Sequence, residues 1–312
     1  MCKEEFNDEC FGEGAVESMD SATNTKQLVK LPMESSVSQS AGAASSSRSA
    51  RRRKAPSQQL NAESQAAAVA ETDAALLQHL VARLGLEPPA FLARGQRGVV
   101  FVASYAGGAS RDVAVKLART KKRPRDGAPP DESRAAEREA AWLKRCNGFG
   151  VGPALLAVEG SAVAMAFAEG DTIGGALEKA TAGDRDALAT ALADLLGQCR
   201  ALDERGIDKK EMGRCARHVV VRDGRCVLLD FERCAESAKP QNVTGVAQYL
   251  SQSWASAQLA RAGIAVDVAG VRAASKAYKD ARSEEAFLAL ERALGLRRGG
   301  GDEDPPRQRT GS

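Results

Sequence analysis

Apolar residues recur along the chain with two spacings, one typical of helices and the other of strands. From about residue 60 to 84, leucines and valines stand three and four apart, and Gly85 supplies a stop signal, so this stretch predicts an amphipathic helix. The next two apolar runs, GVVFVASY and DVAVKLAR, are separated by AGGASR, whose two glycines suit a hairpin loop. These runs predict an antiparallel ribbon.

The middle of the chain predicts a helix followed by a second pair of strands. The charged, proline-rich stretch 119–132 is typical of a loop, and Asp131 or Ser133 could cap a helix that continues through about Cys146. The stretch GVGPALLAVEGSAVAMAFAEG then predicts two short strands around a turn at residues 159–160.

The remaining pattern is mostly helical. Helical spacing extends over residues 173–204, from about 243 to 262 and over 266–296, interrupted by the paired strands of HVVVRDGRCVLLD. The order of elements predicts an α+β fold of two lobes. The first lobe, about 86–170, is small and β-rich with one helix, and the second, about 171–297, is mostly helical with a short β-hairpin.

Both ends of the chain lack such periodicity. Residues 1 to about 58 are rich in Ser, Ala, Gly and polar residues and are predicted to be disordered, and residues 298–312 form a second polar tail. Within the first tail, Arg51–Lys54 form a basic cluster. Such a cluster is either a nuclear-import signal or, more commonly, part of a solvated tail.

Composition narrows the class of protein. The 43% of hydrophobic residues can bury one sizeable core or two small ones, and the 4% of aromatic residues make that core mostly aliphatic. The 44 basic and 41 acidic residues nearly balance, which favours neither nucleic acid nor a membrane as partner. No run of about 18 apolar residues occurs and the N-terminus is acidic, so we expect a soluble, intracellular, cytoplasmic protein, or a nuclear one if the basic cluster directs import.

Cysteine and histidine do not form a recognisable framework. The seven cysteines are scattered and include no CxxC pair, which predicts reduced thiols rather than disulfides or a zinc site. Because His79 and His218 are the two histidines of the chain, we do not expect a structural transition-metal centre.

Two features in the β-rich half could contact phosphate. Gly95 and Gly98 would let backbone amides approach an anion closely, although glycines three apart also occur in ordinary turns. Lys116 lies on the strand face opposite Val113 and Val115. Its ammonium group suits phosphate oxygens, and the alternative is a lysine that protects an edge strand from aggregation.

Two carboxylates complete the candidate set. Glu139 lies at the margin of a helix face marked by Ala136 and Leu143, where it could hold the ammonium group of Lys116 or be an ordinary surface glutamate. Asp230 ends the apolar run CVLLD, where it could hold Mg²⁺ between the lobes or simply begin a turn.

Taken in order, these segments resemble those of a known family. They are GQRGVVFVA, VAVKLAR, EREAAWLKRCNGFGVGPALLAVEG, AMAFAEGD, LDERGIDKKEMGRCARHVVV, VLLDFERC and KPQNVTGVAQYL. Over about residues 86–262 the chain is similar to the small predicted archaeal-type serine/threonine protein kinases, relatives of the RIO and lipopolysaccharide-kinase branch of the protein-kinase-like superfamily. The resemblance implies a protein-kinase-like fold over residues 59–297 and transfer of the γ-phosphoryl group of ATP, with Mg²⁺, to Ser or Thr hydroxyls.

The resemblance also implies roles for individual residues. It makes Gly95 and Gly98 the phosphate loop and Lys116 the lysine that binds the nucleotide. Glu139 becomes the ion-pair partner of that lysine, and Asp230 becomes the aspartate that binds the metal.

Two further segments are placed by the resemblance. The segment that includes Met165 and Glu169 falls where the interlobe hinge passes the adenine ring, and its backbone is expected to contact the base. Glu232 stands where the Gly of DFG would be, and the next helix is expected near residue 242 or 244. That spacing leaves no room for a long activation segment or a peptide platform.

The catalytic loop departs from the family's pattern. An ordinary kinase loop reads HRDxxxxN, whereas KKEMGRCARH puts Glu211 near the base position and His218 near the Asn position, with two extra residues between them. Imidazole is a poor ligand for Mg²⁺, so His218 is either a metal ligand or a hydrogen-bond partner of backbone or Asp230. Asp208 is a second candidate for the base.

Three functions therefore stay open. The first is an active, atypical protein kinase that uses ATP and Mg²⁺ on Ser or Thr. The second is a pseudokinase, a nucleotide-binding or scaffold module without transfer, because the catalytic loop is altered. The third is a small-molecule kinase, because the short activation segment also suits that class.

Overall fold

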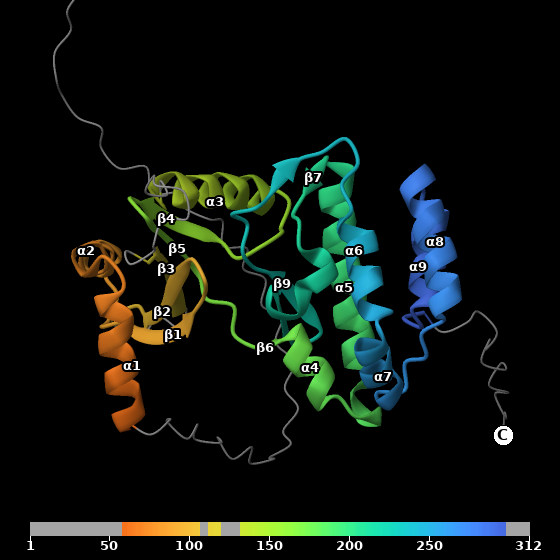
Figure 1. Ribbon diagram of the computed structural model, residues 1–312, viewed down its shortest axis with the longest axis horizontal. Coiled ribbons are helices and arrows are strands. Elements are labelled where there is room, and N and C mark those ends of the chain that lie inside the picture. The colour runs from red at the N-terminus through yellow and green to blue at the C-terminus, as the bar shows by residue number, and fades with distance from the viewer. Residues whose placement is uncertain (1–57, 107–111, 120–131, 298–312) are drawn as a thin grey trace, which may run out of the picture. The chain divides into compact units, whose positions relative to one another are not determined.

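The computed structural model describes residues 58–106, 112–119 and 132–297 (Figure 1). The two predicted tails, the basic cluster Arg51–Lys54 and the candidate cap Asp131 lie outside the described residues. Within the described ranges, the chain forms two lobes that share one compact unit.

The first lobe is a five-stranded antiparallel sheet with strand order β1-β2-β3-β5-β4. Its strands are β1 (Ala90–Arg94), β2 (Gly98–Ser104), β3 (Asp112–Ala118), β4 (Leu155–Glu159) and β5 (Ala162–Ala166). Helix α3 (Glu132–Asn147) lies along β4 and β5, and helices α1 (Gln58–Ala70) and α2 (Ala74–Leu84) lie at the other side of the sheet (Figure 1). The predicted ribbon of β2 and β3 and the predicted pair β4 and β5 are confirmed.

The two faces of this sheet belong to two apolar clusters. Val113 and Val115 pack in one cluster with Leu80 of α2, whereas Ala114 packs in the other with Leu143 of α3. This division follows from the alternation of side chains along a strand. It puts Lys116, two residues beyond Ala114, on the face covered by α3.

The second lobe is mostly helical. Its helices are α4 (Ile173–Lys179), α5 (Arg185–Glu204), α6 (Asn242–Leu250), α7 (Ser253–Arg261), α8 (Val268–Ala281) and α9 (Glu284–Ala293). The predicted hairpin is confirmed as β8 (Val219–Arg222) and β9 (Arg225–Leu228), which β6 (Asp171–Thr172) extends into three strands. A two-residue strand, β7 (Ile207–Asp208), pairs with β10 (Ala235–Glu236).

Each of the long predicted helices is broken in the structure. The stretch 60–84 turns between α1 and α2, where the Thr72 hydroxyl donates to Val69 O at 3.1 Å and Asp73 Oδ1 accepts from Leu76 N at 3.0 Å. Such side-chain contacts end one helix and cap the next. The predicted helix over 173–204 is likewise divided by a 3₁₀ turn at Ala182–Asp184. The predicted stretch of about 243–262 is divided into α6 and α7, and the stretch 266–296 into α8 and α9.

The structure differs from the sequence-based expectation at two strands. Strand β1 was not predicted, because its residues are mostly exposed and lack a clear alternation. Strand β9 ends at Leu228, so Asp230 lies two residues beyond it and adopts a positive φ of 64°. The carboxylate is therefore held by a strained turn and not by the end of the strand.

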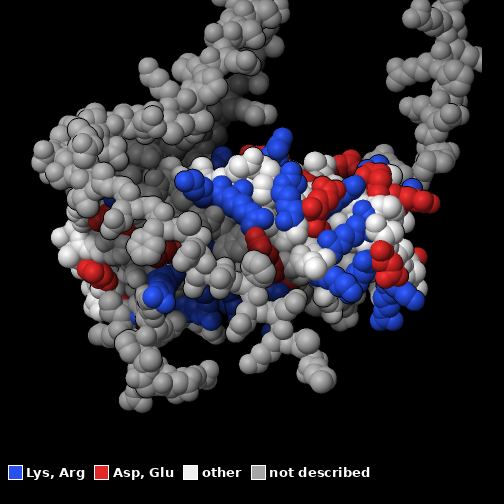
Figure 2. Space-filling view, turned by 90° about the horizontal axis from the view of Figure 1, so that it is seen from above, with Lys and Arg blue, Asp and Glu red and all other residues white. Residues whose placement is uncertain are grey.

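The predicted α+β fold class, with a small β-rich lobe and a mostly helical lobe, is confirmed by this arrangement of sheet, helix α3 and helical lobe. The five cysteines among the described residues are all free and buried. Basic and acidic side chains are interspersed on the described part of the face in Figure 2. Among the described helices, none combines the length and the apolar character needed to cross a membrane.

Candidate functional site

Lys116 lies in the middle of the sheet. Strand β3 runs between β2 and β5, and Lys116 pairs with Val100 on one side and Val163 on the other. The interpretation of Lys116 as a protective edge-strand lysine is therefore wrong, since both neighbouring positions are occupied by strands.

Glu139 on α3 is the nearest acidic partner of Lys116. The distance from Lys116 Nζ to Glu139 Oε2 is 2.8 Å, and Phe231 N donates to Glu139 Oε1 at 3.4 Å. Only 3% of Glu139 is exposed, so it lies deeper than the margin predicted for it. Burial raises the pKa of the Glu139 carboxyl, although the ammonium group of Lys116 opposes that shift.

Asp230 and Glu232 bring two more carboxylates to the same ammonium group. Lys116 Nζ lies 3.1 Å from Asp230 Oδ1 and 3.6 Å from Glu232 Oε2. Burial alone would raise the pKa of Asp230, but Lys116 and the buried Lys209 outweigh it and lower that pKa. Burial alone would likewise lower the pKa of Lys116, but the carboxylates around it, led by Glu139, raise it. We therefore expect the Lys116 ammonium group and the Asp230 carboxylate to be charged near neutral pH.

This cluster has the charge and the atoms to accept a hard cation. Three carboxyl groups face one ammonium group, so several oxygen atoms converge on one place. Asp230 also belongs to a second group with Glu211 and His218, whose ligand atoms lie within 4.8 Å of one another. Oxygen ligands of this kind fit Mg²⁺, and Asp230 is the residue common to both groups.

The glycine segment forms the turn between β1 and β2. Gly95 N donates to Gly98 O at 2.8 Å, and a Cβ atom at Gly98 would lie 2.8 Å from Leu117 O. Glycine is therefore required at position 98 by the close approach of β3. Between the two glycines, Arg97 Nη1 reaches Glu232 Oε1 at 2.5 Å, so the turn is tied to the second lobe.

The two candidate bases occupy different surroundings. Asp208 on β7 accepts from Lys210 N at 3.0 Å and pairs with Lys210 Nζ at 2.7 Å. Glu211 instead lies near His218, with Oε2 3.9 Å from His218 Nε2, and forms an ion pair with Arg233. The structure thus brings Glu211, and not Asp208, into the group that contains Asp230.

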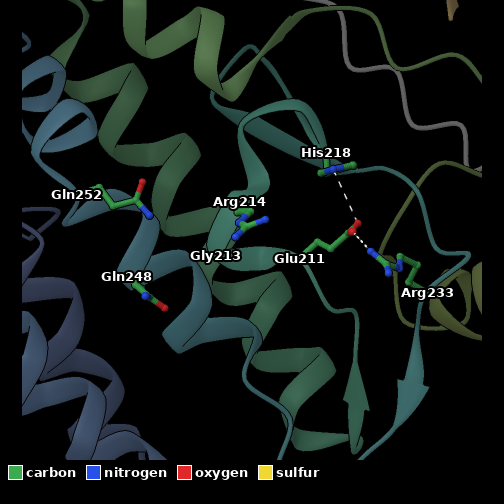
Figure 3. Close-up of a pocket in the computed structure, with 7 residues that line it drawn as sticks. All are labelled: Glu211, Gly213, Arg214, His218, Arg233, Gln248 and Gln252. Atoms are coloured by element: carbon green, nitrogen blue, oxygen red, sulfur yellow. Dashed lines mark hydrogen bonds and ion pairs between the residues drawn. The ribbon is translucent and has the colours of Figure 1, made fainter. Parts of the chain in front are cut away.

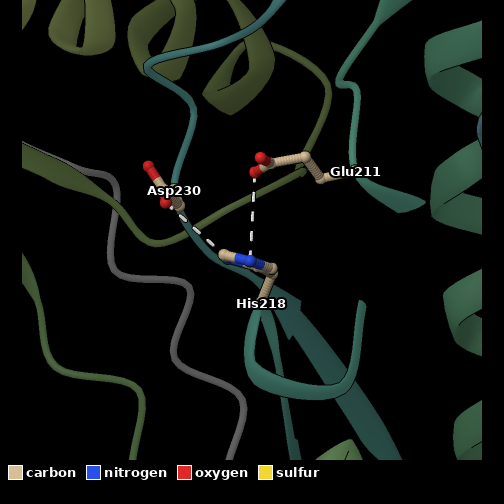
Figure 4. A group of neighbouring side chains, drawn as sticks. All are labelled: Glu211, His218 and Asp230. Atoms are coloured by element: carbon tan, nitrogen blue, oxygen red, sulfur yellow. Dashed lines mark ion pairs between the residues drawn. The ribbon is translucent and has the colours of Figure 1, made fainter. Parts of the chain in front are cut away.

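His218 lies between the two carboxylates (Figure 4). Its Nδ1 is 3.6 Å from Asp230 Oδ2, which is long for a hydrogen bond. Burial and the charge of Lys209 lower the pKa of His218, so we expect a neutral ring at pH 7. Lys210, Glu211 and Asp230 all have positive φ angles, between 57° and 64°.

Lys209 was not predicted as a site residue. Its side chain is 2% exposed, its Nζ donates to the backbone oxygen of Asp230 at 3.1 Å, and it lies over the Phe231 ring at 5.3 Å from the centroid. Burial lowers the pKa of this amine. The contact holds the turn that presents the Asp230 carboxylate. The sequence carried no signal for it, because two adjacent lysines usually indicate a solvated surface.

The predicted hinge segment, residues 165–170, begins at the end of β5. Met165 on β5 pairs with Ala114 on the neighbouring strand β3 and is buried in the larger apolar cluster. Glu169 lies beyond the strand and its Oε2 accepts from Arg222 Nη1 at 2.7 Å. Residues 167–170 then connect the sheet to β6 of the second lobe.

A polar pocket of about 560 Å³ adjoins Glu211 in the second lobe (Figure 3). Its lining residues come from the 3₁₀ turn Met212–Arg217 and its flanks, from the segment after Asp230, from α6 and from the residue before α7. They are Glu211, Gly213, Arg214, His218, Arg233, Gln248 and Gln252. The glutamines and Arg233 were not predicted, because no motif connects such distant positions.

No protein-family model and no curated protein match this chain. Among solved structures, the Rio2 kinase–ADP/Mg²⁺–phosphoaspartate complex from Chaetomium thermophilum is similar over 70% of this chain and 73% of that chain, with 14% identity and a TM-score of 0.45. The ADP-bound aminoglycoside phosphotransferase APH(2'')-Ib is similar over 72% of this chain and 98% of that chain, with 12% identity and a TM-score of 0.37. With TM-scores below 0.5, these likenesses carry no functional argument, and the archaeal-type family stays a prediction.

Proposed function

We propose that this chain is a phosphotransferase that moves the γ-phosphoryl group of ATP to a hydroxyl group, with Mg²⁺ as cofactor. The observation that carries the proposal is the convergence of Lys116, Glu139 and Asp230 from β3, α3 and the turn after β9. Both carboxylates lie within 3.1 Å of one ammonium group. Such an arrangement suits the phosphates and the metal ion of a bound nucleotide.

The first lobe supplies the contacts to ATP in this proposal. Lys116 contacts phosphate oxygens, and the buried Glu139 fixes the position of its ammonium group. The turn from Gly95 to Gly98 lets backbone amides approach the same phosphates. The backbone of the hinge that includes Met165 and Glu169 contacts the adenine ring.

Asp230 is the proposed ligand of the metal ion. Its pKa is lowered, so the carboxylate is charged at neutral pH and offers oxygen atoms to a hard cation. Bound Mg²⁺ would neutralise charge on the phosphate oxygens. His218 offers a neutral imidazole, which is a poor magnesium ligand, so we assign it to the orientation of the neighbouring Asp230 and Glu211 carboxylates.

Glu211 is the proposed general base. The acceptor oxygen forms a bond to the γ-phosphorus as the bond between that phosphorus and the β,γ-bridging oxygen breaks, and the hydroxyl proton passes to the Glu211 carboxylate. The products are ADP and the phosphorylated acceptor. Asp208 is less suited to this role because both of its carboxylate oxygens already accept from Lys210.

The resemblance implies a Ser or Thr hydroxyl of a protein as acceptor, and a small-molecule hydroxyl uses the same chemistry. Helix α6 begins at Asn242, and only β10 lies between it and Asp230. This short connection also suits a small-molecule acceptor, because a long activation segment that could hold an extended peptide is not possible over eleven residues.

One observation favours nucleotide binding without transfer as a second candidate function. The Glu211 carboxylate forms an ion pair with Arg233. This ion pair stabilises the charged carboxylate and so opposes its protonation, which a general base requires. A chain that binds MgATP tightly but does not turn it over would belong to this class.

The test is release or transfer of labelled γ-phosphate from ATP by the full chain, with water or the chain itself as acceptor. We expect Mg²⁺-dependent turnover that falls by about 10²-fold or more in Glu211→Gln, because a general base is removed. Asp208→Asn is expected to retain most of the activity, which separates the two candidate bases. Equal rates for the unsubstituted chain and Asp230→Ala would exclude the proposed enzyme.

A further inference from the structure

The polar pocket beside Glu211 has the position of an acceptor site, provided that the proposed phosphotransfer function holds. Figure 3 shows Glu211 and His218 toward one side of the pocket and Gln248 and Gln252 toward the other, with Arg214 between them. A molecule that fills this pocket would place one end at the proposed base. Its other end would lie near the two glutamines.

The charges in the pocket do not cancel. Arg233 forms an ion pair with Glu211, which leaves Arg214 as the other guanidinium group of the lining. Arg214 is exposed, and its side chain makes no hydrogen bond or ion pair with any residue in the described part of the chain. The pocket therefore offers one uncompensated positive charge a short way from the base.

The backbone fixes the place of this arginine. Arg214 has φ −135° and ψ 37°, which interrupt the 3₁₀ turn Met212–Arg217. Helix α6 packs directly against the turn, since a Cβ atom at Gly245 would lie 3.0 Å from Met212 Cβ and 3.1 Å from Gly213 N. The close approach of α6 brings Gln248 to the same pocket, and Gln252, which immediately precedes α7, also lines it.

The size of the pocket favours a small ligand. A volume of about 560 Å³ falls within the range of about 300–1,000 Å³ that small-molecule sites occupy. Six of the seven lining residues have polar side chains, which can form hydrogen bonds with hydroxyl or other polar groups of a ligand.

We propose that this pocket binds the acceptor and that the acceptor is a small hydroxyl compound carrying a carboxylate or phosphate group. Arg214 pairs with the anionic group, because a guanidinium group matches the geometry of either anion. Gln248 and Gln252 donate to and accept from further hydroxyls. The reacting hydroxyl lies at Glu211, gives its proton to that carboxylate and takes the γ-phosphoryl group as ADP leaves.

Binding of inorganic phosphate tests the anion site without any transfer. Phosphate is titrated into the unsubstituted full chain and into the variants Arg214→Gln and Arg217→Gln, and binding is followed by ³¹P NMR. The three titrations are repeated with the additional substitution Lys116→Met, which removes the proposed nucleotide-binding lysine. Arg217 belongs to the same turn and is exposed but does not line the pocket, so it is the matched control. We expect Arg214→Gln to raise the Kd for phosphate by about tenfold or more, through the loss of a charge-assisted contact, with Arg217→Gln unchanged. Equal affinities in Arg214→Gln and the unsubstituted chain would overturn the proposal.

Acceptors that differ in whether they carry an anionic group then test the role of that group in turnover. ATP consumption is measured with glycerol 3-phosphate and glycerate, each compared with glycerol, and with a Ser-containing peptide library. We expect the anionic compounds to be preferred, and Arg214→Gln to raise the KM of the acceptor while the KM of ATP stays unchanged. Preference for peptides, with KM insensitive to Arg214→Gln, would overturn the proposal. A different result would refute the phosphotransfer function and leave the anion site standing. In that result the chain binds phosphate through Arg214 but does not bind MgATP.

Discussion

At the residue scale, one ammonium group organises the candidate site. Lys116 contacts Glu139, Asp230 and Glu232, and Glu139 is almost fully buried. A buried carboxylate depends on its counter-charge, because desolvation disfavours its charged form. The stability of the site should therefore respond to the charge of Lys116 and to pH in a defined direction.

Lys116→Met is expected to lower the free energy of unfolding by about 2–4 kcal/mol near pH 8, because Glu139 remains buried without its partner. The substitution raises the pKa of Glu139 further above its unfolded value, so the native state binds a proton that the unfolded state releases. Stability of the variant, relative to the unsubstituted chain, should thus fall as pH rises from about 5 to about 8. Denaturant unfolding at several pH values measures this.

The control for this prediction is the double variant Lys116→Met/Glu139→Gln, which removes the uncompensated charge. It should recover part of the loss at pH 8 and show a weaker dependence on pH. If Lys116→Met is equally stable at both ends of the pH range, the buried pair does not have the energetic role given to it.

The candidate site residues that the sequence predicted and the structure brings together each have a local signature. Lys116 interrupts a strand pattern, Glu139 follows a packed helix face, and Asp230 follows an apolar run. The sequence did not identify Arg97 or Lys209, whose contacts with Glu232 and with the Asp230 backbone exist only after the lobes fold. A single sequence contains no record of such tertiary contacts.

At the element scale, a buried carboxylate joins two helices. Asp203, near the end of α5, is 1% exposed and accepts from Asn242 N at 3.0 Å, from Asn242 Nδ2 at 2.7 Å and from Val243 N at 3.2 Å. Asn242 Oδ1 in turn accepts from Lys209 N at 2.9 Å. This network begins α6 and fixes the backbone that leads to Glu211.

Asp203→Ala is expected to cost about 3 kcal/mol or more of unfolding free energy, because it leaves buried donors without an acceptor. Asp267 is the matched comparison, since it caps α8 by accepting from Gly270 N at 2.9 Å in an exposed position. Asp267→Ala should cost only about 1 kcal/mol. Equal losses for the two variants, measured by chemical denaturation, would show that the Asp203 network contributes no more than an ordinary cap.

The breaks between helices were the least predictable feature of the elements. Residues 60–84 keep a continuous apolar spacing, yet Thr72 and Asp73 end one helix and begin another within three residues. The spacing of apolar residues identifies a helical stretch and its buried face. A turn between two helices changes the direction of the chain without interrupting that spacing, so the sequence pattern does not reveal it. The hairpin of β8 and β9 was predictable because Asp223 and Gly224 supply a turn with two positive φ angles.

At the scale of the whole molecule, the two lobes are joined by side chains from both. Lys116 of the sheet contacts Asp230 of the helical lobe, and Arg97 contacts Glu232. The order of the lobes could be predicted from the order of strand and helix patterns. The proposed acceptor pocket could not be predicted, because Arg214 and Gln248 share no motif and only the packing of α6 brings them together.

Hydrogen exchange with and without MgATP tests the central claim most directly, because it locates the nucleotide on both lobes at once. We expect slower exchange in β2 and β3, in hinge residues 167–170 and in residues 229–234, and we expect this protection to be lost in Asp230→Asn at the same nucleotide concentration. Protection elsewhere in the chain, or none under conditions where the chain is folded, would contradict a nucleotide site at Lys116, Glu139 and Asp230.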